Sequence, residues 1–591
     1  MADFLIVTGR GPDAERWFDT GLRVAAAQGF GPPARAIRSD GLRAAVFARR
    51  ASGHTPELVG SGEHWSLVSG TCLVPEAAKT LLDEGLEAFT THADGAFAIA
   101  RGDETGAELA TDPIGTHHVH VRVGRDVTAV AGSALWLAAL DEDALDPSAC
   151  EEFLATGVIY EDRTPWRSVR ALPPATRFAV SAQGVRPIGR TWSPEDLAPG
   201  SLQGSAAVET FGTAMLDACT RLGARIERPV ADLTAGWDSR LLCGFLMRAG
   251  LPIETTVTGP ADGADVLLSK QIAAHLGIQH LVLPLGAPPT ADEVLEAVEL
   301  TDGLVNAVGY ARILRVHRTL SARFGASLNG SFGEVARGYW WEILRPSPEH
   351  TGPLDPATIS RARYAAGAPD LRLFGPDVRP SAVEHFADLI ARTDRSVTGQ
   401  VPMSFRLDQT YLRLRMRSWH GRIASSTDRL WPCLSPMASR GALEALLRIP
   451  TAERISNRFA RRVLAQFAPR LARLPLESGG PALPRTLTNA WRFTPEALGF
   501  ARRAFKKLTG QRTYARTLEE TSGPRLALLS DDRISDRMQA STMALGDHVD
   551  RERLAAVLTA MRAPEWPHDL AFGNLLALEL ALERARELRR G

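Results

Sequence analysis

At 591 residues the chain is too long for one ordinary hydrophobic core, so its length predicts two or more domains. Hydrophobic residues make up 45% and charged residues 23%, as in soluble globular proteins. Lys+Arg and Asp+Glu each number 68, which gives no global field for steering nucleic acid, although a local basic patch remains open. No apolar run is long enough to span a membrane. We therefore expect neither a nucleic-acid partner nor a membrane partner.

The five cysteines are scattered and form no Cys-x-x-Cys pair, which predicts reduced, mostly buried thiols in a cytoplasmic protein. They are Cys72, Cys150, Cys219, Cys243 and Cys433. The first ten residues contain an acidic residue and only a short apolar run, so they do not resemble a signal peptide.

The first part of the chain alternates short apolar segments with Gly, Pro and Asp, a pattern typical of β-strands. Two longer segments, Asp13–Ala27 and Glu76–Leu86, are expected to be helices. Together these patterns predict a β-rich layer with a few helices. The expected strands lie at residues 44–47, 64–68, 97–100, 118–123 and 128–131.

Three histidines, His117, His118 and His120, fall at one of these expected strands. His118 and His120 would share one face of it. A metal site would need further ligands, and neither a cysteine nor an acid of the same face is near in sequence. The pattern therefore favours packing or surface roles over metal binding.

The stretch that follows Arg228 combines three local patterns. The apolar run Val230–Leu233 predicts a buried parallel strand, Thr234–Gly236 a tight turn of small residues, and the sequence from about Asp238 a helix. Such a turn directs backbone N–H groups and the helix dipole at one point, which predicts an anion site. Thr234 and Ser239 add hydroxyl donors, and Asp238 suits a Mg²⁺ ion that bridges phosphates. The simpler alternative is an ordinary strand–turn–helix connection.

Two further strands and a helix follow this turn. Ile253–Val257 and His280–Leu285 are expected strands, separated by an amphipathic helix from Asp265 to His275. Strand, helix and strand at this spacing predict right-handed parallel units in a doubly wound sheet, which binds ligands at the carboxyl ends of its strands. Asp265 is either a simple helix N-cap or a residue of the site, and both interpretations stay open.

A second strand, Gly-rich turn and helix start occupy residues 326–341 and predict another anion-facing turn. The turn contains one acid, Glu334, whose carboxylate is a type of group that can bind Mg²⁺. Arg337, and Arg240 just after the first turn, are expected to pair with phosphate through their guanidinium groups. Beyond a segment rich in Pro and Gly, the rest of the chain is expected to be largely helical.

The residues Thr234-Ala-Gly-Trp-Asp-Ser239 resemble the Ser-Gly-Gly-x-Asp-Ser pyrophosphate loop of ATP pyrophosphatases, specifically of the asparagine synthetase family. Residues 326–341 resemble that family's Gly-x-Gly-x-Asp-Glu-x-x-x-Gly-Tyr segment, one residue shorter. The resemblance implies ATP and Mg²⁺ as cofactors, Asp238 and Glu334 as metal ligands, and residues 256–259 beside the adenosine. The ATP- and pyrophosphate-binding residues that it implies are Thr234, Ala235, Gly236, Trp237, Asp238, Ser239, Arg240, Thr258, Gly330, Ser331 and Arg337.

The N-terminal segments follow the order of the family's glutaminase-type domain. Asp94-Gly-Ala-Phe-Ala-Ile-Ala100 resembles its Gly-x-Phe-Ala strand, and Thr111-Asp-Pro-Ile-Gly115 resembles its Arg-Asp-x-x-Gly turn. Glutaminases of the family need a cysteine directly after the initiator Met as nucleophile, whereas this chain has Ala2. We therefore expect a domain that is inactive as a glutaminase and retained as a scaffold.

The resemblance implies an α/β protein in two parts. Residues 1–192 would form an amidotransferase-type αββα domain, similar to Ntn hydrolases, and residues 193–205, rich in Pro, Gly and Ser, a linker. Residues 206–591 would form a doubly wound synthetase domain, similar to adenine-nucleotide α-hydrolases, with a helical extension.

The function implied is a ligase that adenylates a substrate carboxylate with ATP and Mg²⁺ and lets an amine displace AMP. With Ala2, that amine is expected to be ammonia or an amine of the substrate itself. The latter case is similar to lasso-peptide cyclases and β-lactam synthetases, and there a precursor-peptide or leader-binding partner would fit. The catalytic group stays unassigned, because Leu474–Pro484 stands where the family has a Lys-x-Gly-Phe-like stretch.

Two alternatives remain. A degenerate nucleotide-binding scaffold would explain the shortened second turn and the missing lysine, although Asp238 argues against decay of the site. Transfer of sulfur to tRNA would need a reactive cysteine near the loop. Cys243 follows the loop, but its place in an apolar helix favours the core.

Overall fold

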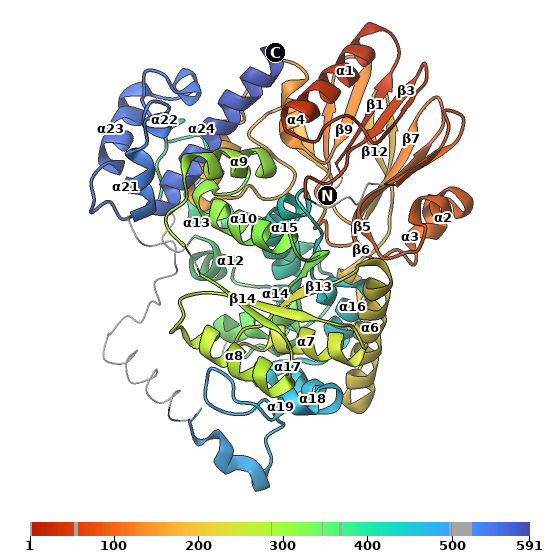
Figure 1. Cartoon of the computed structure of the whole chain (residues 1–591), viewed down its shortest axis with the longest axis vertical. Coiled ribbons are helices and arrows are strands. Elements are labelled where there is room, and N and C mark those ends of the chain that lie inside the picture. The colour runs from red at the N-terminus through yellow and green to blue at the C-terminus, as the bar shows by residue number, and fades with distance from the viewer. Residues whose placement is uncertain are drawn as a thin grey trace.

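The computed structural model describes residues 3–51, 57–284, 286–344, 347–365, 369–495, 498 and 523–590. It is a mixed α/β protein with two antiparallel sheets in its N-terminal part and one parallel sheet after them (Figure 1). This confirms the mixed α/β class. None of the described helices is both long and apolar enough to cross a lipid bilayer. All five cysteines are free and buried, as expected.

The first six-stranded sheet has the order β10-β8-β9-β1-β3-β2, and every pair in it is antiparallel. Helices α1 (Pro12–Ala27) and α4 (Ala134–Ala139) pack on its outer face. In β1, Phe4 and Ile6 belong to the core between the sheets, while Leu5 and Val7 join the core under α1. The strands are β1 (Phe4–Gly9), β2 (Arg35–Arg38), β3 (Leu42–Val46), β8 (His120–Val123), β9 (Val127–Ala131) and β10 (Val169–Ala171).

The second six-stranded sheet, of order β12-β11-β7-β6-β5-β4, is also antiparallel and carries α2 and α3 on its outer face. The layers are thus helix, sheet, sheet and helix. The predicted helix Glu76–Leu86 is divided at Gly85, whose φ of 83° ends α2 (Ala77–Glu84) and precedes α3 (Leu86–Thr90). The strands are β4 (Glu57–Gly60), β5 (Trp65–Cys72), β6 (Gly95–Gly102), β7 (Ala107–Thr111), β11 (Thr176–Ser181) and β12 (Gly184–Arg190).

The third sheet is parallel, with the order β15-β14-β13-β16-β17. Apolar residues fill both of its faces, because Val230 lies in one core and Ala231 and Leu233 lie in the other. This explains the unbroken apolar run that predicted β13. The strands are β13 (Pro229–Asp232), β14 (Glu254–Thr258), β15 (His280–Leu283), β16 (Ala326–Leu328) and β17 (Cys433–Leu434).

Helices cover both faces of the parallel sheet (Figure 1). One face is covered by α6 (Gly204–Arg225), α7 (Asp238–Arg248), α8 (Ala264–Leu276), α16 (Arg440–Arg448) and α18 (Arg458–Phe467). The other is covered by α9 (Ala291–Thr301), α10 (Ala307–Ser321) and α24 (Asp569–Arg590). The short α5 (Pro147–Thr156) of the N-terminal part packs against α24.

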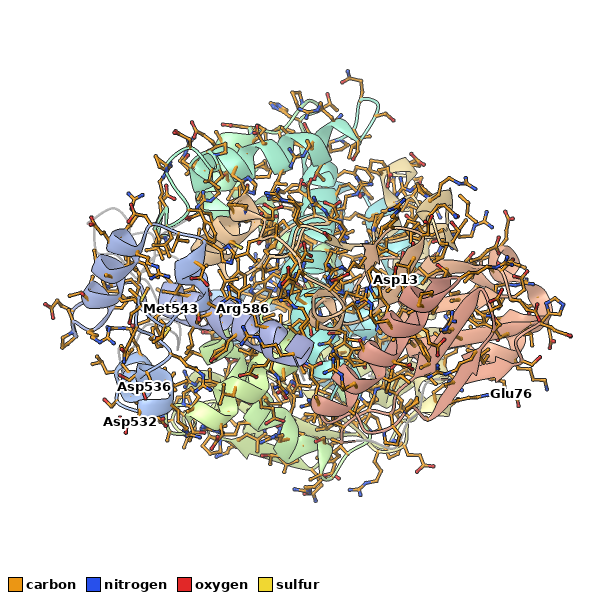
Figure 2. The ribbon with its side chains drawn as sticks, turned by 90° about the horizontal axis from the view of Figure 1, so that it is seen from above. Asp13, Glu76, Asp532, Asp536, Met543 and Arg586 are labelled. Atoms are coloured by element: carbon orange, nitrogen blue, oxygen red, sulfur yellow. The ribbon has the colours of Figure 1, made fainter. Side chains whose placement is uncertain are left out.

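The remaining helices lie around the three sheets. The short helices α21 (Gly523–Leu529) and α22 (Asp532–Ser535), with α23 (Arg551–Met561), pack near α24, and Figure 2 shows this group, marked by Met543 and Arg586, on the side of the molecule opposite Glu76. Further helices are α11 (Gly333–Arg337), α12 (Pro356–Ile359), α13 (Ala382–Arg395), α17 (Thr451–Arg454) and α19 (Pro469–Ala472).

One long helical rod connects the two parts of the protein. It runs through α14 (Met403–Thr410), a π-helical section (Tyr411–His420) and α15 (Gly421–Asp428). Beyond the end of α15, Arg429 forms buried ion pairs with Asp302 and with Asp3 of the first sheet. Arg49 of the N-terminal part likewise pairs with Asp428 at 3.0 Å.

The predicted linker is not a loose connection. Its Glu195 is buried and pairs with Arg190 and Arg413. The backbone N–H groups of Gly200 and Leu202 both donate to the carbonyl of Arg448. The segment therefore packs against the second part of the chain.

Candidate functional site

The two predicted turns meet at the carboxyl edge of the parallel sheet. Strand β13 leads into the loop 233–237 and then α7, and its neighbour β16 leads into residues 329–332 and then α11. On the other side of β13 lies β14, so the chain moves away from β13 in both directions. In open α/β sheets such a switch of strand order creates a crevice at the carboxyl ends, where ligands bind.

Two glycines allow the second turn to lie directly on the first. A Cβ atom added to Gly330 would stand 2.7 Å from the carbonyl carbon of Asp238 and 2.8 Å from the backbone nitrogen of Ser239. A Cβ added to Gly333 would stand 2.5 Å from Oδ1 of Asp238. Any other residue at either place would separate the turns, so the Gly-rich sequence is explained by this close approach.

The first loop is held by hydrogen bonds within itself. Ser239 Oγ accepts a bond from the backbone N–H of Thr234 at 3.0 Å and lies 3.0 Å from the Thr234 hydroxyl. The N–H of Gly236 donates to that same hydroxyl at 3.2 Å. Within the described residues, the backbone N–H groups of Trp237 and Asp238 have no acceptor, and they begin α7, where the positive end of the helix dipole lies.

Asp265 supports this loop from the neighbouring helix. Its Oδ1 accepts a hydrogen bond from the backbone N–H of Ala235 at 2.9 Å. The residue that caps α8 is Gly263, two positions earlier. Of the two interpretations of Asp265, the simple N-cap is therefore wrong, and the carboxylate helps to shape the loop.

Asp238 and Arg337 form a two-point ion pair at the meeting of the turns. Arg337 Nε donates to Oδ1 at 2.8 Å and a terminal nitrogen donates to Oδ2 at 2.6 Å. Both side chains are about one-fifth exposed or less. Parallel bonds of this kind are among the stronger charge-assisted contacts. The residues predicted for metal and for phosphate thus bind each other in this structure.

Glu334 lies beside this pair. The hydroxyl of Tyr411, from the start of the π-helical section, donates to Glu334 Oε2 at 2.7 Å. Burial, and next the negative charge of Asp238, raise the pKa of Glu334 above its usual range. The two predicted metal ligands are therefore close enough to influence each other's charge.

Arg240 lies against the phosphate loop, where one of its terminal nitrogens donates to the backbone carbonyl of Ala235 at 3.5 Å, and its expected pairing with phosphate stays a prediction. Its side chain is fully buried and donates to the backbone carbonyls of Leu474 and Pro475. Burial lowers its pKa to about 10. Arg240 thus fixes the segment Leu474–Pro484 beside the loop. Nearby, the Arg461 guanidinium stands 4.8 Å from the centre of the Trp237 ring.

Thr258 and Ser331 lie at the same edge of the sheet. Thr258 is exposed at the end of β14. Ser331 donates its backbone N–H to the side chain of Asn329 and places its hydroxyl 3.4 Å from Nδ1 of His420. Both are thus at the edge where the resemblance placed them, and neither is engaged in the core.

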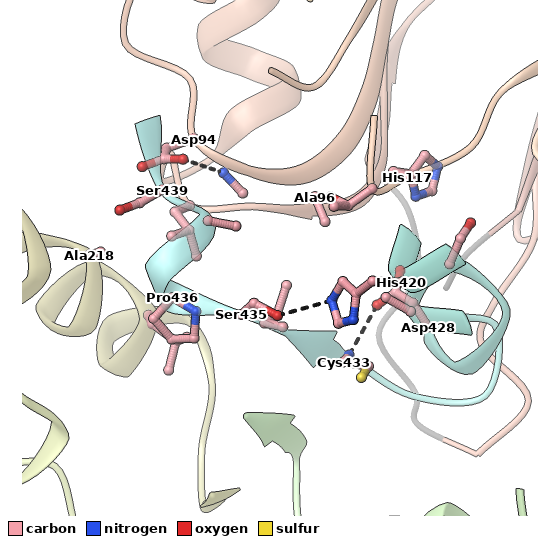
Figure 3. Close-up of a pocket in the computed structure, with 18 residues that line it drawn as sticks. Asp94, Ala96, His117, Ala218, His420, Asp428, Cys433, Ser435, Pro436 and Ser439 are labelled. Atoms are coloured by element: carbon pink, nitrogen blue, oxygen red, sulfur yellow. Dashed lines mark hydrogen bonds between the residues drawn. The ribbon is translucent and has the colours of Figure 1, made fainter. Parts of the chain in front are cut away.

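A small cavity lies between the two parts of the chain (Figure 3). Its volume is about 40 Å³, enough for a water molecule. His117 comes from the N-terminal part, and His420, Asp428 and Ser435 come from the second part. Burial lowers the pKa of His117 to about 3 and that of His420 to about 4, so both rings are neutral at pH 7.

Among the described residues, Cys72 is the cysteine nearest in sequence to the position of the glutaminase nucleophile, and it does not replace that nucleophile. Ala2 lies outside the described residues. Burial raises the pKa of the Cys72 thiol to about 12, so the thiolate needed for attack is not formed at neutral pH. The nearest cysteine in sequence is therefore a packed core residue.

His118 and His120 are buried, with ring centres 6.2 Å apart. Each has a backbone carbonyl within hydrogen-bond distance, that of Arg417 for His118 and that of Gly132 for His120. Over the ranges that the structure describes, no group of three His, Cys, Asp or Glu side chains is placed to hold a metal ion. The pair packs at the interface with α15.

Sequence reasoning missed a further group of polar residues on the face of the sheet under α10. Asp232, Thr256 and His317 line a cavity of about 330 Å³ there. The signal in the sequence was a carboxylate at the end of an otherwise apolar buried strand. Burying a carboxyl group without a hydrogen-bond partner lowers stability. The presence of an acid at this position therefore needs a reason other than packing.

No protein-family model matches the chain, and no curated protein matches it. Thirty-one chains of solved structures do match. One is a glutamine phosphoribosylpyrophosphate amidotransferase from B. subtilis, in complex with ADP and GMP, at 11% identity and a TM-score of 0.23. A second, described as the allosteric regulatory enzyme of purine biosynthesis, has 10% identity and a TM-score of 0.23.

The first match covers 47% of this chain and 65% of the amidotransferase, which is less than two thirds of that protein. The second covers 50% of this chain and 76% of the other. At these scores the likeness carries no argument about function.

Proposed function

We propose that this protein is an ATP- and Mg²⁺-dependent ligase that joins a carboxylate to an amine and releases AMP and pyrophosphate. The observation that carries the proposal is the direct contact of the two Gly-rich turns at the switch point of the sheet. That contact brings free backbone N–H groups, a helix N-terminus, two carboxylates and Arg337 to one place.

The loop supplies the features that a pyrophosphate needs. The N–H groups of Trp237 and Asp238 point from the start of an eleven-residue helix, and Thr234 and Ser239 add hydroxyls. Fixed donors of this kind stabilise charge without reorganising as it develops on the leaving phosphates. We infer that pyrophosphate binds over this loop, beside the second turn that Gly330 allows to approach it.

The residues present fit Mg²⁺ in donor type, because Asp238 and Glu334 offer carboxylate oxygens, which this ion prefers. In its bound state the ion would neutralise phosphate charge. Asp238 would first exchange its partner, since both of its oxygens accept bonds from Arg337. The guanidinium of Arg337, released from Asp238, would then be free to pair with phosphate. This exchange would explain why Arg337 and Asp238 occupy one position in the site.

In the proposed reaction a carboxylate oxygen attacks the α-phosphorus of ATP, and the bond to the pyrophosphate oxygen breaks. An amine nitrogen then attacks the carbonyl carbon of the acyl-adenylate. The bond to AMP breaks, and the nitrogen loses a proton. Because Ala2 stands where a glutaminase of the resembled family has its cysteine, we infer that the amine is free ammonia or belongs to the substrate.

The test is product analysis with Mg-ATP and pairs of carboxylates and amines, including aspartate with ammonia and candidate peptides. We expect acceptor-dependent AMP and pyrophosphate. Asp238→Asn should lower AMP formation by about 100-fold or more while the protein stays folded. The control is Asp388→Asn, an exposed acid on α13, which should leave the rate unchanged. Formation of ADP and phosphate, or full activity of Asp238→Asn, would refute the proposal.

A further inference from the structure

A further small cavity lies where the helical rod meets the first antiparallel sheet. Its volume is about 20 Å³, which holds one water molecule or one ion of similar size but not a phosphate. Arg422, Ser425 and Ser426 of α15 line it from the second part of the chain. His120 of β8 and the nearby His118 line it from the first part. Both parts of the protein therefore contribute polar side chains to this one small space.

Arg422 brings a positive charge into this space without a counter-charge. It is 3% exposed and forms no ion pair with any residue that the structure describes. One of its several N–H groups donates to the backbone carbonyl of Ile159, at a long 3.4 Å, and its buried Nε has no acceptor. Burying a charged group without partners costs much free energy. An orphaned guanidinium on a cavity wall is therefore a sign of a bound ion or water.

The acids nearby do not supply the missing charge. Asp302 lines the cavity, but each of its two oxygens already accepts two hydrogen bonds, one from Arg429 and one from the start of α4. Asp3 also pairs with Arg429, at 3.3 Å. Burial, and next the positive charge of Arg417, lower the pKa of Arg422 to about 10, so Arg422 stays charged at pH 7.

The remaining polar groups distinguish between water and an anion as the occupant. Ser425 Oγ accepts a bond from the backbone N–H of His118 at 3.2 Å, which leaves its own proton to donate. Nδ1 of His120 lies 3.0 Å from the carbonyl of Gly132, so the proton of the neutral ring is on Nδ1, and Nε2 has no partner among the described residues. A water molecule would join Nε2 to the guanidinium but would leave its charge unbalanced. An anion would balance it.

We propose that this cavity binds one small monovalent anion, a halide such as chloride, held by the guanidinium of Arg422 and the hydroxyls of Ser425 and Ser426. A halide accepts several hydrogen bonds at once and fits a space of this size, whereas carboxylates and phosphates do not. The ion balances the charge that the second part of the protein buries against the first, and so stabilises their contact. None of the residues that line the cavity belongs to the two turns, so the anion site does not depend on the proposed ligase reaction.

The first experiment locates the ion in the unchanged protein. Crystals of the full chain are soaked in sodium bromide, because bromide is a halide whose anomalous scattering marks its position. We expect a peak within hydrogen-bond distance of the Arg422 guanidinium and the two serine hydroxyls. Peaks on the molecular surface alone would show an adventitious ion only, and the inference would then be wrong.

The second experiment measures the melting temperature of the unchanged protein in sodium chloride and in sodium gluconate at equal ionic strength. Both salts screen charges alike, but gluconate is too large for the cavity. An ion that binds only the folded state stabilises it, so we expect chloride to raise the melting temperature by about 2 °C or more, up to a plateau. Equal melting temperatures in the two salts would mean that water occupies the cavity, and would overturn the inference.

The third experiment removes the groups that hold the ion. Arg422→Met replaces the guanidinium with an uncharged chain and should abolish the rise with chloride, whereas Arg392→Met, at an exposed arginine of α13, should keep it. If Arg422→Met does not fold, Ser426→Ala, which removes one hydroxyl, should raise the chloride concentration at half of the plateau about tenfold. A rise that persists in Arg422→Met, or an unchanged half-plateau concentration in Ser426→Ala, would contradict the site.

Discussion

One group of buried charges is paired at the interface between the two parts of the protein. At the carboxyl edge of the parallel sheet, one buried carboxyl group is unpaired among the described residues. At the interface, Arg429 pairs with both Asp302 and Asp3, and Asp302 also accepts bonds from Ser133 and Ala134. At the sheet edge, Asp232 has no partner in the described ranges. Saturated charges fix one arrangement, whereas unsatisfied ones mark where a ligand is expected.

The largest effect is expected from breaking the saturated ion pairs of the interface. Arg429→Ala would leave Asp302 and Asp3 buried without a counter-charge, at a cost of about 3–5 kcal/mol in unfolding free energy. Urea denaturation measures it. Arg392→Ala, which breaks an ion pair with Glu161 that is 39% exposed or more on each side, should change stability by less than about 1 kcal/mol. Similar losses of unfolding free energy in the two variants would contradict the expected difference between buried and exposed ion pairs.

A smaller effect on stability, but a clear one on binding, is expected where the turns touch. Gly333→Ala adds a Cβ 2.5 Å from Asp238 Oδ1 and so displaces the carboxylate. We expect affinity for Mg-ATP to fall about tenfold, with little change in melting temperature. Gly62→Ala is the control, since its Cβ would find its nearest neighbour at 3.9 Å. Unchanged ATP binding in Gly333→Ala would show that this contact is not required.

A third effect concerns the pH dependence of stability. The folded-state pKa of Asp232, about 7, lies above the unfolded value of about 4. The folded protein therefore keeps a proton that the unfolded chain releases, so this group lowers stability as pH rises from 4 to 7. Asp232→Asn should lose less stability than the wild type between pH 5 and pH 7 in urea denaturation. Parallel curves would show that Asp232 is solvated or paired.

Much of the fold follows from local sequence patterns. The periodicity located α1 and α8 within one residue at each end, because both have one consistently apolar face. It missed the break at Gly85, since a single glycine is compatible with a helix until its left-handed backbone is seen. It predicted a linker at residues 193–205, but composition does not reveal that Glu195 of this segment pairs with two arginines.

For the candidate site, the sequence predicted the two turns but not the partners of their side chains. Arg240 and Arg337 looked alike as phosphate ligands, yet one is buried against backbone carbonyls and the other binds Asp238. The partner of each arginine is set by which side chains the tertiary fold places opposite its helix. Those side chains come from distant parts of the sequence, so local patterns do not predict them. Asp232 gave a local signal, whereas Thr256 and His317 become neighbours only in the folded sheet.

The helical rod from Met403 to Asp428 has a consequence for how such a protein can change over time. Tyr411 near its start contacts Glu334, and Asp428 at its end is held by Arg49 of the N-terminal part. Removal of the N-terminal part would detach the far end of the rod, because the ion pair of Asp428 with Arg49 would be lost. Natural selection for the position of one tyrosine would then preserve the N-terminal part as well, whatever chemistry that part itself performs.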